Sequence, residues 1–360
     1  MIQILVTVGL ALLVGLQQTD QPPISFPEFL AGVRTEALTR GISQATVDSA
    51  LTGIEPVTVV VARDRAQPEL VQSLDSYVTQ RLTATRVEKG RVLAGTHGDL
   101  LARIEKTYGL SAPMMVSIWG LESNYGAFTG TYPTIASLAT LAYDGRRPLF
   151  RTELFEALRI VDQGRATAAE LKGSWAGAMG QPQFMPSSYL THAVDFDGDG
   201  HADIWTSLPD VFASMANYLK NSGWQAGERW GREVKVSKAA MTRIDRAVGM
   251  RTGGCRATRE MTVAQPLSAW KKYGVTLSDG RPLPAADLSA SLVRGDKRNF
   301  LVYGNYQALL AYNCSHSYAI TVGLMADRIA ESQKLKVKSQ NFAHSSRWAA
   351  RGSGFVTFDF

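Results

Sequence analysis

Hydrophobic residues recur at every third or fourth position along the first part of the chain, the spacing of helices that bury one face. The pattern predicts helices over residues 26–40 and 43–51, and further helices between about residue 68 and residue 108. Interspersed lysines and arginines are assigned to a solvated face. We therefore predict a helical domain over residues 23–108. The recurring apolar positions of its last part are Leu70, Leu74, Tyr77, Val78, Leu82, Val92, Leu93, Leu100, Leu101 and Ile104.

Beyond residue 126 the same helical pattern is interrupted by one stretch of a different texture. Helices are predicted over residues 134–143, 149–161, 207–221, 300–312 and 317–329. Short apolar segments, turns and alternating positions predict a small β-containing domain over residues 231–299. The tail, residues 334–360, is polar and expected to be loosely ordered. The expected fold class is mainly α, of the α+β type.

The N-terminus, residues 1–22, contains an uncharged apolar run from Ile4 to Leu16. The run is too short to cross a membrane comfortably and has the length of the hydrophobic region of an export signal. A buried N-terminal strand or helix is the alternative. Since no cysteine follows the run, a lipid anchor on that residue type is not expected, and we predict an exported, periplasmic protein.

Charge and cysteine content narrow the classes of partner. The net charge is +6 and the pI is about 9.3, which suits a polyanion such as an anionic cell wall. No cluster of basic residues interleaved with aromatics occurs, so nucleic acid is not expected as a partner. Two cysteines, Cys255 and Cys314, exclude a disulfide-dense scaffold and a cysteine-based zinc site. The sequence leaves open whether they are bridged or are two buried thiols.

Glu122 is the first candidate for chemistry. It ends an apolar helical run that begins near Ser111, a plausible N-cap, and Pro113, and that stops at Asn124. Apolar surroundings and the negative end of the helix dipole both predict a raised pKa for this carboxyl group. A raised pKa is what a general acid requires near neutral pH. The alternative is an ordinary glutamate on the solvent side of a helix end.

Two further stretches predict a binding cleft. Residues 172–189 combine closely spaced glycines with serine, glutamine and aromatic residues, which suit the hydroxyl groups and flat faces of sugars. A tightly packed loop would have the same composition. A turn at residues 144–148 carries Arg146 and Arg147, which are either merely exposed or placed at the rim of a cleft for an anionic substrate.

Residues 195–206 resemble the calcium-binding loop of an EF-hand through its first six positions. Asp203 occupies position 9, but position 12 is Thr206 in place of the usual glutamate. Asp210, on the following helix, is a candidate for the missing carboxylate. We predict a weakly bound, structural Ca²⁺ or Na⁺ and no cofactor for catalysis. One loop without a partner hand argues against a calcium sensor.

Five motifs occur in an order that resembles a known family: WGLESNYG, GSWAGAMGQPQFMPSSY, DFDGDGHADIW, SMANYLKNSGW and NYQALLAYNCSHSY. They are similar to the membrane-bound lytic murein transglycosylase B family, over roughly residues 26–330. The resemblance implies a lysozyme-like catalytic core, here residues 109–230 with 300–333. It also implies cleavage of the β-1,4 bond between N-acetylmuramic acid and N-acetylglucosamine in peptidoglycan, with formation of 1,6-anhydro ends.

The resemblance also implies roles for residues that match the family motifs. Glu122 matches the single catalytic acid and base. Three departures weaken the match: Pro182 replaces a small residue, an extra residue precedes Asp210, and the lipid-anchor cysteine is absent. The matching cation-loop residues are Asp195, Asp197, Asp199, His201 and Asp210. The matching substrate-cleft residues are Arg146, Arg147, Ser174, Gln183, Phe184, Tyr218, Tyr312, Asn313 and Tyr318, with Tyr77 upstream.

The absence of a second carboxylate from the cleft motifs agrees with this chemistry, because ordinary glycosidases use two. A one-carboxylate enzyme can act if the substrate supplies its own nucleophile. The alternatives are a hydrolytic lysozyme or chitinase-like enzyme and a non-catalytic cell-wall binding protein. The expected partners are glycan strands and cell-wall remodelling proteins, and the expected state is a monomer.

Overall fold

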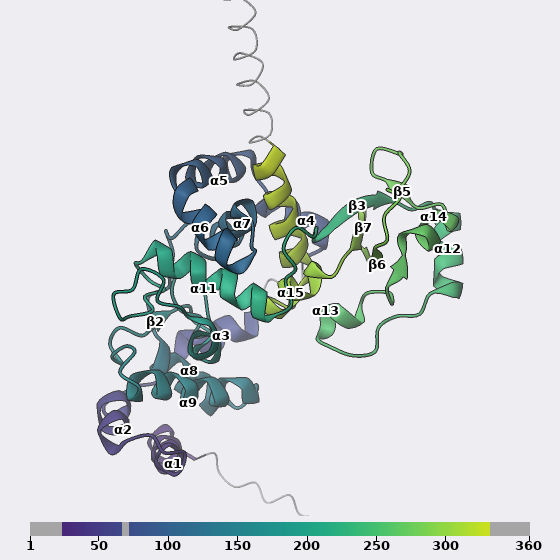
Figure 1. Cartoon of the computed structure of the whole chain (residues 1–360). Coiled ribbons are helices and arrows are strands. Elements are labelled where there is room, and N and C mark those ends of the chain that lie inside the picture. The colour runs from purple at the N-terminus through teal and green to yellow at the C-terminus, as the bar shows by residue number, and fades with distance from the viewer. Residues whose placement is uncertain (1–23, 67–71, 332–360) are drawn as a thin grey trace, which may run out of the picture.

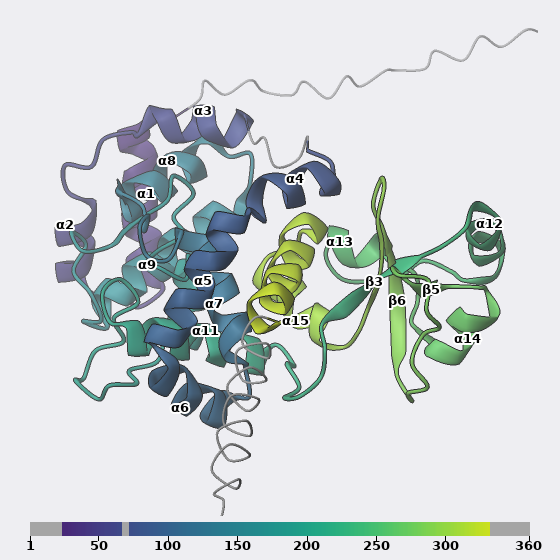
Figure 2. The ribbon, with the colours of Figure 1, turned by 90° about the horizontal axis from the view of Figure 1, so that it is seen from above.

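The structure is a computed structural model that describes residues 24–66 and 72–331. The apolar run at residues 4–16 and the tail at 334–360 lie outside the described residues. Helices dominate and a small antiparallel sheet lies at one end (Figures 1 and 2), which confirms the expected fold class. Three hydrophobic cores organise these elements.

The first core joins helices from the start and the middle of the chain. Serine side chains begin two of them, since Ser25 and Ser43 each accept a hydrogen bond from a first-turn amide. Val33 and Phe155 are among its buried residues. The helices are α1 (Phe26–Thr39), α2 (Gln44–Leu51), α3 (Thr58–Ala66), α8 (Thr134–Asp144), α9 (Pro148–Asp162) and α10 (Pro186–His192).

The second core contains the central helices and a last helix formed by residues 316–331, drawn in yellow in Figure 1. The helices of residues 23–108 therefore divide between two cores, because α1 to α3 belong to the first and α4 to α6 to the second. The labelled helices of the second core are α4 (Leu74–Arg81), α5 (Ala84–Thr96), α6 (Gly98–Tyr108), α7 (Ala112–Ser123), α11 (Leu208–Asn221) and α15 (Asn305–Tyr312).

The third core lies in the sheet region, where five strands pair antiparallel in the order β4-β6-β7-β3-β5. The strands are β3 (Gly231–Lys235), β4 (Gln265–Pro266), β5 (Thr276–Leu277), β6 (Ser289–Arg294) and β7 (Asn299–Val302). Short helices accompany them: α12 (Lys238–Ala247), α13 (Arg256–Arg259) and α14 (Leu267–Lys272). A separate pair joins β1 (Tyr132–Pro133) to β2 (Lys172–Gly173).

One helix prediction was wrong at its start. Residues 300–312 were expected to be helical, but β7 takes Phe300 to Val302 and α15 begins only at Asn305. The run from Phe300 to Val302 is buried on both faces, between β3 and β6. A short, wholly apolar run has no periodicity that separates a buried strand from a buried helix.

Cys255 and Cys314 form a disulfide, with 6.2 Å between their Cα atoms. This settles the alternative that the sequence left open. The bond joins the start of α13 to the segment between α15 and the last helix. The bond therefore ties α13, which also packs against the second core, to the segment that carries Tyr312 and Tyr318.

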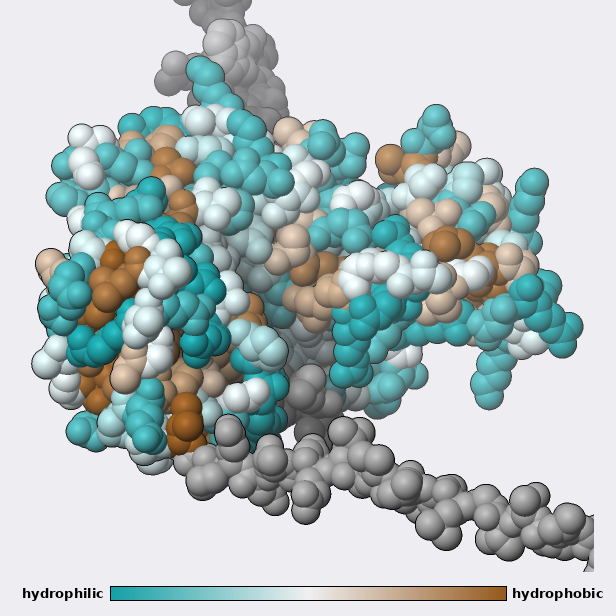
Figure 3. Space-filling view, turned by 90° about the horizontal axis from the view of Figure 1, so that it is seen from below, coloured by the Kyte–Doolittle hydropathy of each residue, from teal (hydrophilic) through white to brown (hydrophobic). Residues whose placement is uncertain are grey.

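The surface of the molecule is largely hydrophilic on the face seen in Figure 3, with apolar side chains in separate small areas. Within residues 24–66 and 72–331, no helix is both long enough and apolar enough to cross a membrane.

Candidate active site

Helix α7 carries Glu122 in its last turn, as the sequence predicted. The apolar residues of this helix are buried in the second core, which explains why so hydrophobic a helix forms here. Ser111 stands at the N-cap, but its side chain makes no capping hydrogen bond. The Ala112 amide donates instead to the Glu105 carboxylate, at 3.1 Å. A buried, rigid helix therefore presents a glutamate that is only partly buried.

The chain reverses directly after Glu122 through three residues with positive φ: Asn124 at 51°, Tyr125 at 63° and Gly126 at 77°. Only glycine adopts this conformation without strain, so the turn is held by its surroundings. Trp119 Nε1 donates to Gln181 Oε1 at 2.6 Å, and a Cβ on Gly126 would lie 2.5 Å from the same oxygen. These contacts lock the turn against the glycine-rich run.

Three tyrosines from two parts of the chain, Tyr218 of α11 and the nearby pair Tyr312 and Tyr318, lie together. The Tyr312 hydroxyl donates to the Pro182 carbonyl at 2.6 Å, and the Tyr218 hydroxyl donates to the Ala311 carbonyl at 2.7 Å. The rings of Tyr312 and Tyr318 lie parallel, with centroids 6.4 Å apart. Tyr218 and Tyr312 contact both the first and the second core. The cluster therefore lies where the two cores meet.

Phe184 supports this cluster from beneath. Its ring lies 5.6 Å from that of Tyr218 and 5.9 Å from that of Tyr312, and only 2% of the residue is exposed. The sequence suggested that this ring offers a flat face to sugars. The structure instead uses the ring as core packing.

Electrostatic effects place Glu122 within this group. Burial raises the pKa of Tyr312 well above its usual value, and the Glu122 charge adds to the effect. Burial likewise raises the pKa of Tyr318, with further contributions from Glu122 and, more weakly, from Tyr77. Asn313 follows Tyr312 and is exposed. The electrostatic effects thus bring together five predicted residues from four segments: Tyr77, Glu122, Tyr218, Tyr312 and Tyr318.

The glycine-rich run folds into a tight loop that holds two more predicted residues. Ser174 Oγ accepts a hydrogen bond from the Ala178 amide at 3.2 Å. Gln183 has a φ of 53° and donates through Nε2 to the carbonyl oxygens of Gly180, at 2.8 Å, and Thr129, at 3.2 Å. Both polar side chains therefore help to shape the loop itself.

The arginine pair lies in the turn between α8 and α9, and each arginine forms an ion pair with Asp64 of α3. Arg146 Nη1 is 3.3 Å from one carboxylate oxygen and Arg147 Nε is 3.4 Å from the other. The two arginine side chains are 43% and 40% exposed, whereas the Asp64 side chain is 2% exposed. Sequence reasoning did not find Asp64.

The acidic loop brings together three of its five predicted ligands. Oxygen atoms of Asp195, Asp197 and Asp210 lie within 4.8 Å of one another. A set of carboxylate oxygens suits a hard cation such as Ca²⁺. Among the described residues, the side chains of Asp199 and His201 do not join this group, so their assignment to the cation site stays a prediction. Asp199 instead accepts a hydrogen bond from the His201 amide, at 2.8 Å.

Asp210 also organises the loop backbone. It is fully buried and accepts hydrogen bonds from the amides of Phe196, at 2.7 Å, and Asp203, at 2.9 Å. Desolvation raises its pKa. Asp203 itself accepts from the Thr206 amide, at 2.9 Å, and from its hydroxyl. The extra residue before Asp210 thus does not prevent its carboxylate from reaching the loop.

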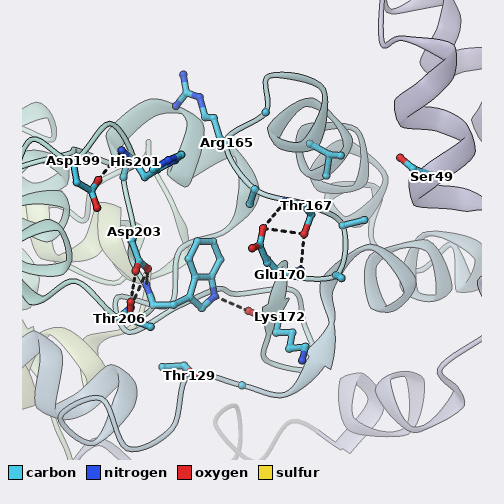
Figure 4. A pocket seen from close by; sticks show the side chains of 18 residues that line it. Ser49, Thr129, Arg165, Thr167, Glu170, Lys172, Asp199, His201, Asp203 and Thr206 are labelled. Carbon is cyan, nitrogen blue, oxygen red and sulfur yellow. Dashed lines mark hydrogen bonds between the residues drawn. The ribbon is translucent and has the colours of Figure 1, made fainter.

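A cavity of about 1120 Å³ lies beside the acidic loop, and Glu122 does not line it (Figure 4). Its walls come from the loop after α9, the end of the acidic loop and the segment at Thr129. The charged residues that line it are Arg165, Glu170, Lys172, Asp199, His201 and Asp203.

Asp64, Gln181 and Tyr125 are the supporting residues that sequence reasoning missed. Tyr125 donates to the Arg86 carbonyl at 2.6 Å and so anchors the turn after Glu122 to α5. Gln181 lies inside the glycine-rich motif, so its residue type and position could have identified it from the sequence. Nothing in the sequence around Asp64 could have identified that residue, because the arginines that it contacts are distant in the sequence.

Comparisons with known proteins agree with this geometry. The family model described as "Transglycosylase SLT domain" matches residues 25–327. Membrane-bound lytic murein transglycosylase B of Escherichia coli is 32% identical over 260 residues, which are 71% of this chain and 66% of that protein.

Solved structures of lytic transglycosylases also resemble this chain in fold. SltB3 from Pseudomonas aeruginosa, in complex with NAG-anhNAM-pentapeptide, is 41% identical with a TM-score of 0.76, and the match covers 85% of this chain and 80% of that one. The E. coli lytic transglycosylase Slt35 in complex with calcium is 27% identical with a TM-score of 0.68, over 87% and 94% of the two chains. The chain therefore has the fold of these enzymes and belongs to the lytic murein transglycosylase family that carries the SLT domain.

Proposed function

We propose that this protein cleaves the β-1,4 bond between N-acetylmuramic acid and N-acetylglucosamine in peptidoglycan, with Glu122 as the only acid and base. One observation carries the assignment. Glu122, in the last turn of the buried helix α7, is a carboxylate whose charge acts on both Tyr312 and Tyr318. The motifs that supply the predicted cleft residues contain no second carboxylate of the kind that ordinary glycosidases use.

The reaction proceeds in two proton transfers. Protonated Glu122 donates its proton to the glycosidic oxygen as the bond to C1 of the muramic sugar breaks. The N-acetyl oxygen of that sugar stabilises the positive charge at C1. Glu122, now a carboxylate, removes the proton of the C6 hydroxyl while O6 bonds to C1. The sugar ends as a 1,6-anhydro ring, the acid is restored, and no water is consumed.

The remaining predicted residues bind and orient the strand in this proposal. Arg146 and Arg147 face solvent and suit carboxylate groups. Ser174, Gln183 and Asn313 offer hydrogen bonds, and the tyrosines offer ring faces and hydroxyl groups. A structural Ca²⁺ or Na⁺ at Asp195, Asp197 and Asp210 would hold the acidic loop, with no part in the chemistry.

We also propose that the protein works as a monomer in the periplasm, alongside cell-wall remodelling proteins. The disulfide supports an oxidising compartment. Relatives bound to muropeptide fragments support the glycan as the ligand.

Digestion of purified peptidoglycan in ¹⁸O-labelled water tests the reaction. The muramic ends should be anhydro forms, lighter by one water than reducing ends, and should carry no ¹⁸O. Labelled reducing ends as the main product would identify a hydrolase instead. Binding without any new ends would identify a non-catalytic wall-binding protein.

A further inference from the structure

Asp64 is a buried charge that two exposed charges share. Its side chain is 2% exposed, yet each of its oxygens faces a different arginine of the α8–α9 turn, Arg146 at 3.3 Å and Arg147 at 3.4 Å. Helices α3 and α8 lie side by side in both ribbon views (Figures 1 and 2). The carboxylate therefore lies beneath the pair, and the guanidinium groups extend from it toward solvent.

This arrangement offsets two unfavourable electrostatic effects, the burial of a carboxylate and the repulsion between two guanidinium groups. A buried carboxylate is costly unless it is paired. Two neighbouring guanidinium groups repel each other unless an anion lies between them. Because each arginine carries five N–H donors, the contact with Asp64 leaves donors on the exposed side of each group. One aspartate therefore fixes both side chains without consuming their binding capacity.

The surroundings of Asp64 add positive charge. Arg65 forms an ion pair with Asp144 at 2.8 Å, and the Arg63 guanidinium lies over the Tyr132 ring, 5.6 Å from its centre. Four arginines against two aspartates leave a net charge of +2 on this small area. An anionic ligand is attracted here whatever the orientation of the side chains, so orientation needs a separate test.

We propose that Asp64 is a positioning residue that holds Arg146 and Arg147 in the orientation that receives a carboxylate of the peptide-bearing glycan strand. The inference rests on the proposed function, because the arginine pair is taken there as part of the substrate cleft. Asp64 acts through the arginines and does not touch the substrate. Its removal lowers affinity for anionic ligands alone and leaves the acid chemistry of Glu122 in place.

A matched control separates positioning from charge. Asp64→Asn and Asp144→Asn each remove one negative charge from the same area, but Asp144 contacts Arg65 and not the Arg146–Arg147 pair. If charge alone mattered, both changes would strengthen the binding of an anion. If Asp64 positions the pair, Asp64→Asn weakens binding, whereas Asp144→Asn leaves it unchanged or stronger.

The experiment measures affinity by calorimetry in the full chain carrying Glu122→Gln, so that no ligand is cleaved. The probes are NAG-NAM-pentapeptide and a neutral N-acetylglucosamine tetramer. Asp64→Asn should weaken muropeptide binding by about 5- to 10-fold, the net contribution of one ordinary hydrogen bond, and should leave tetramer binding unchanged. In a chain with Arg146→Ala and Arg147→Ala, adding Asp64→Asn should have no further effect.

Each outcome decides the proposal. Equal or stronger muropeptide binding by Asp64→Asn overturns it, as does an equal loss for both probes. If Asp64→Asn lacks the parent's unfolding transition, Asp64→Glu replaces it, because this variant keeps the charge and moves the carboxylate. Unchanged muropeptide affinity in Asp64→Glu then overturns the proposal. Failure of the parent to bind the muropeptide at all would instead reject the proposed function.

Discussion

At the scale of single residues, Glu122 is the proposed acid and base. Glu122→Gln keeps the shape of the side chain and removes the proton that it transfers. We expect turnover of peptidoglycan to fall by about 10²- to 10⁴-fold, the contribution of a positioned acid and base. Release of soluble fragments from purified peptidoglycan measures the loss. The control is Glu88→Gln, which changes an exposed glutamate on α5 and should retain full activity.

An unchanged unfolding transition in Glu122→Gln is part of the expectation, since the residue is only partly buried. Retention of more than about a tenth of the parent's turnover would remove Glu122 from the mechanism, because a group worth 10²-fold cannot be dispensable.

Phe184 has a different role at the same scale. Phe184→Ala removes a buried ring beneath Tyr218 and Tyr312, and should lower the free energy of unfolding by about 3–5 kcal/mol. Phe128 is the matched control, because it is 71% exposed. Phe128→Ala should change the free energy of unfolding by no more than about 0.5 kcal/mol. Urea denaturation measures the free energy of unfolding of both variants. A change in Phe184→Ala as small as that in Phe128→Ala would contradict the packing role of Phe184.

At the scale of elements, the acidic loop joins α10 to α11 and is the proposed site of a structural cation. Chelation should lower the melting temperature and leave turnover at moderate temperature intact, because an ion bound only by the folded state stabilises that state. Asp195→Asn should abolish the rise in melting temperature on adding calcium. The control is Asp279→Asn, which changes an exposed aspartate near β5 and should retain the rise in melting temperature on adding calcium.

Immediate loss of turnover on chelation, with no change in melting temperature, would point to a catalytic metal. The arrangement argues for a structural role, since the carboxylates of Asp195 and Asp210 also bind the loop's own amides, those of Gly198 and Phe196 among them.

Helix boundaries were the part of the fold that sequence predicted best. The starts and ends of α2, α8, α9 and α11 agree with the apolar period to within a residue or two. These signals are local, since they depend on side chains one turn apart. The strand β7 was missed because Phe300 to Val302 is buried on both faces and therefore shows no alternation of apolar and polar residues.

In the candidate site, too, features that depend on a local stretch of sequence were predicted and features that depend on tertiary contacts were not. Glu122 and the acidic loop were predicted because each motif is contiguous in the sequence. The ion pairs of Asp64 and the assignment of α1–α3 and α4–α6 to different cores depend on tertiary contacts, which leave no local signal. Likewise, periodicity could not distinguish a ring that faces sugars from the buried ring of Phe184.

At the scale of the whole molecule, the disulfide joins the sheet region to the tyrosine segment of the cleft. It closes a loop with a sequence separation of 59 residues. Replacing both cysteines, as Cys255→Ser with Cys314→Ser, should lower the free energy of unfolding by about 2–4 kcal/mol. Turnover should fall as well, because Cys314 lies between Tyr312 and Tyr318.

A reducing agent should reproduce both effects in the parent and add nothing to the double variant. The proposal of a disulfide-held cleft would not survive if reduction left the parent's denaturation curve and turnover unchanged. The double variant treated with the reductant controls for non-specific effects of the reagent.

The meeting of two cores at Tyr218 and Tyr312 has a consequence for how the molecule unfolds. Glu122 belongs to the side of the second core and the arginine pair to the side of the first, so a bound glycan strand bridges both. The ligand then adds a bridge to the polar contacts that the two sides already share, among them the hydrogen bonds from Trp119 to Gln181 and from Tyr312 to Pro182. We expect the two sides to unfold more cooperatively with the ligand bound, because a ligand that contacts both stabilises the folded state of both. The sharpness of the thermal transition then becomes a measure of occupancy.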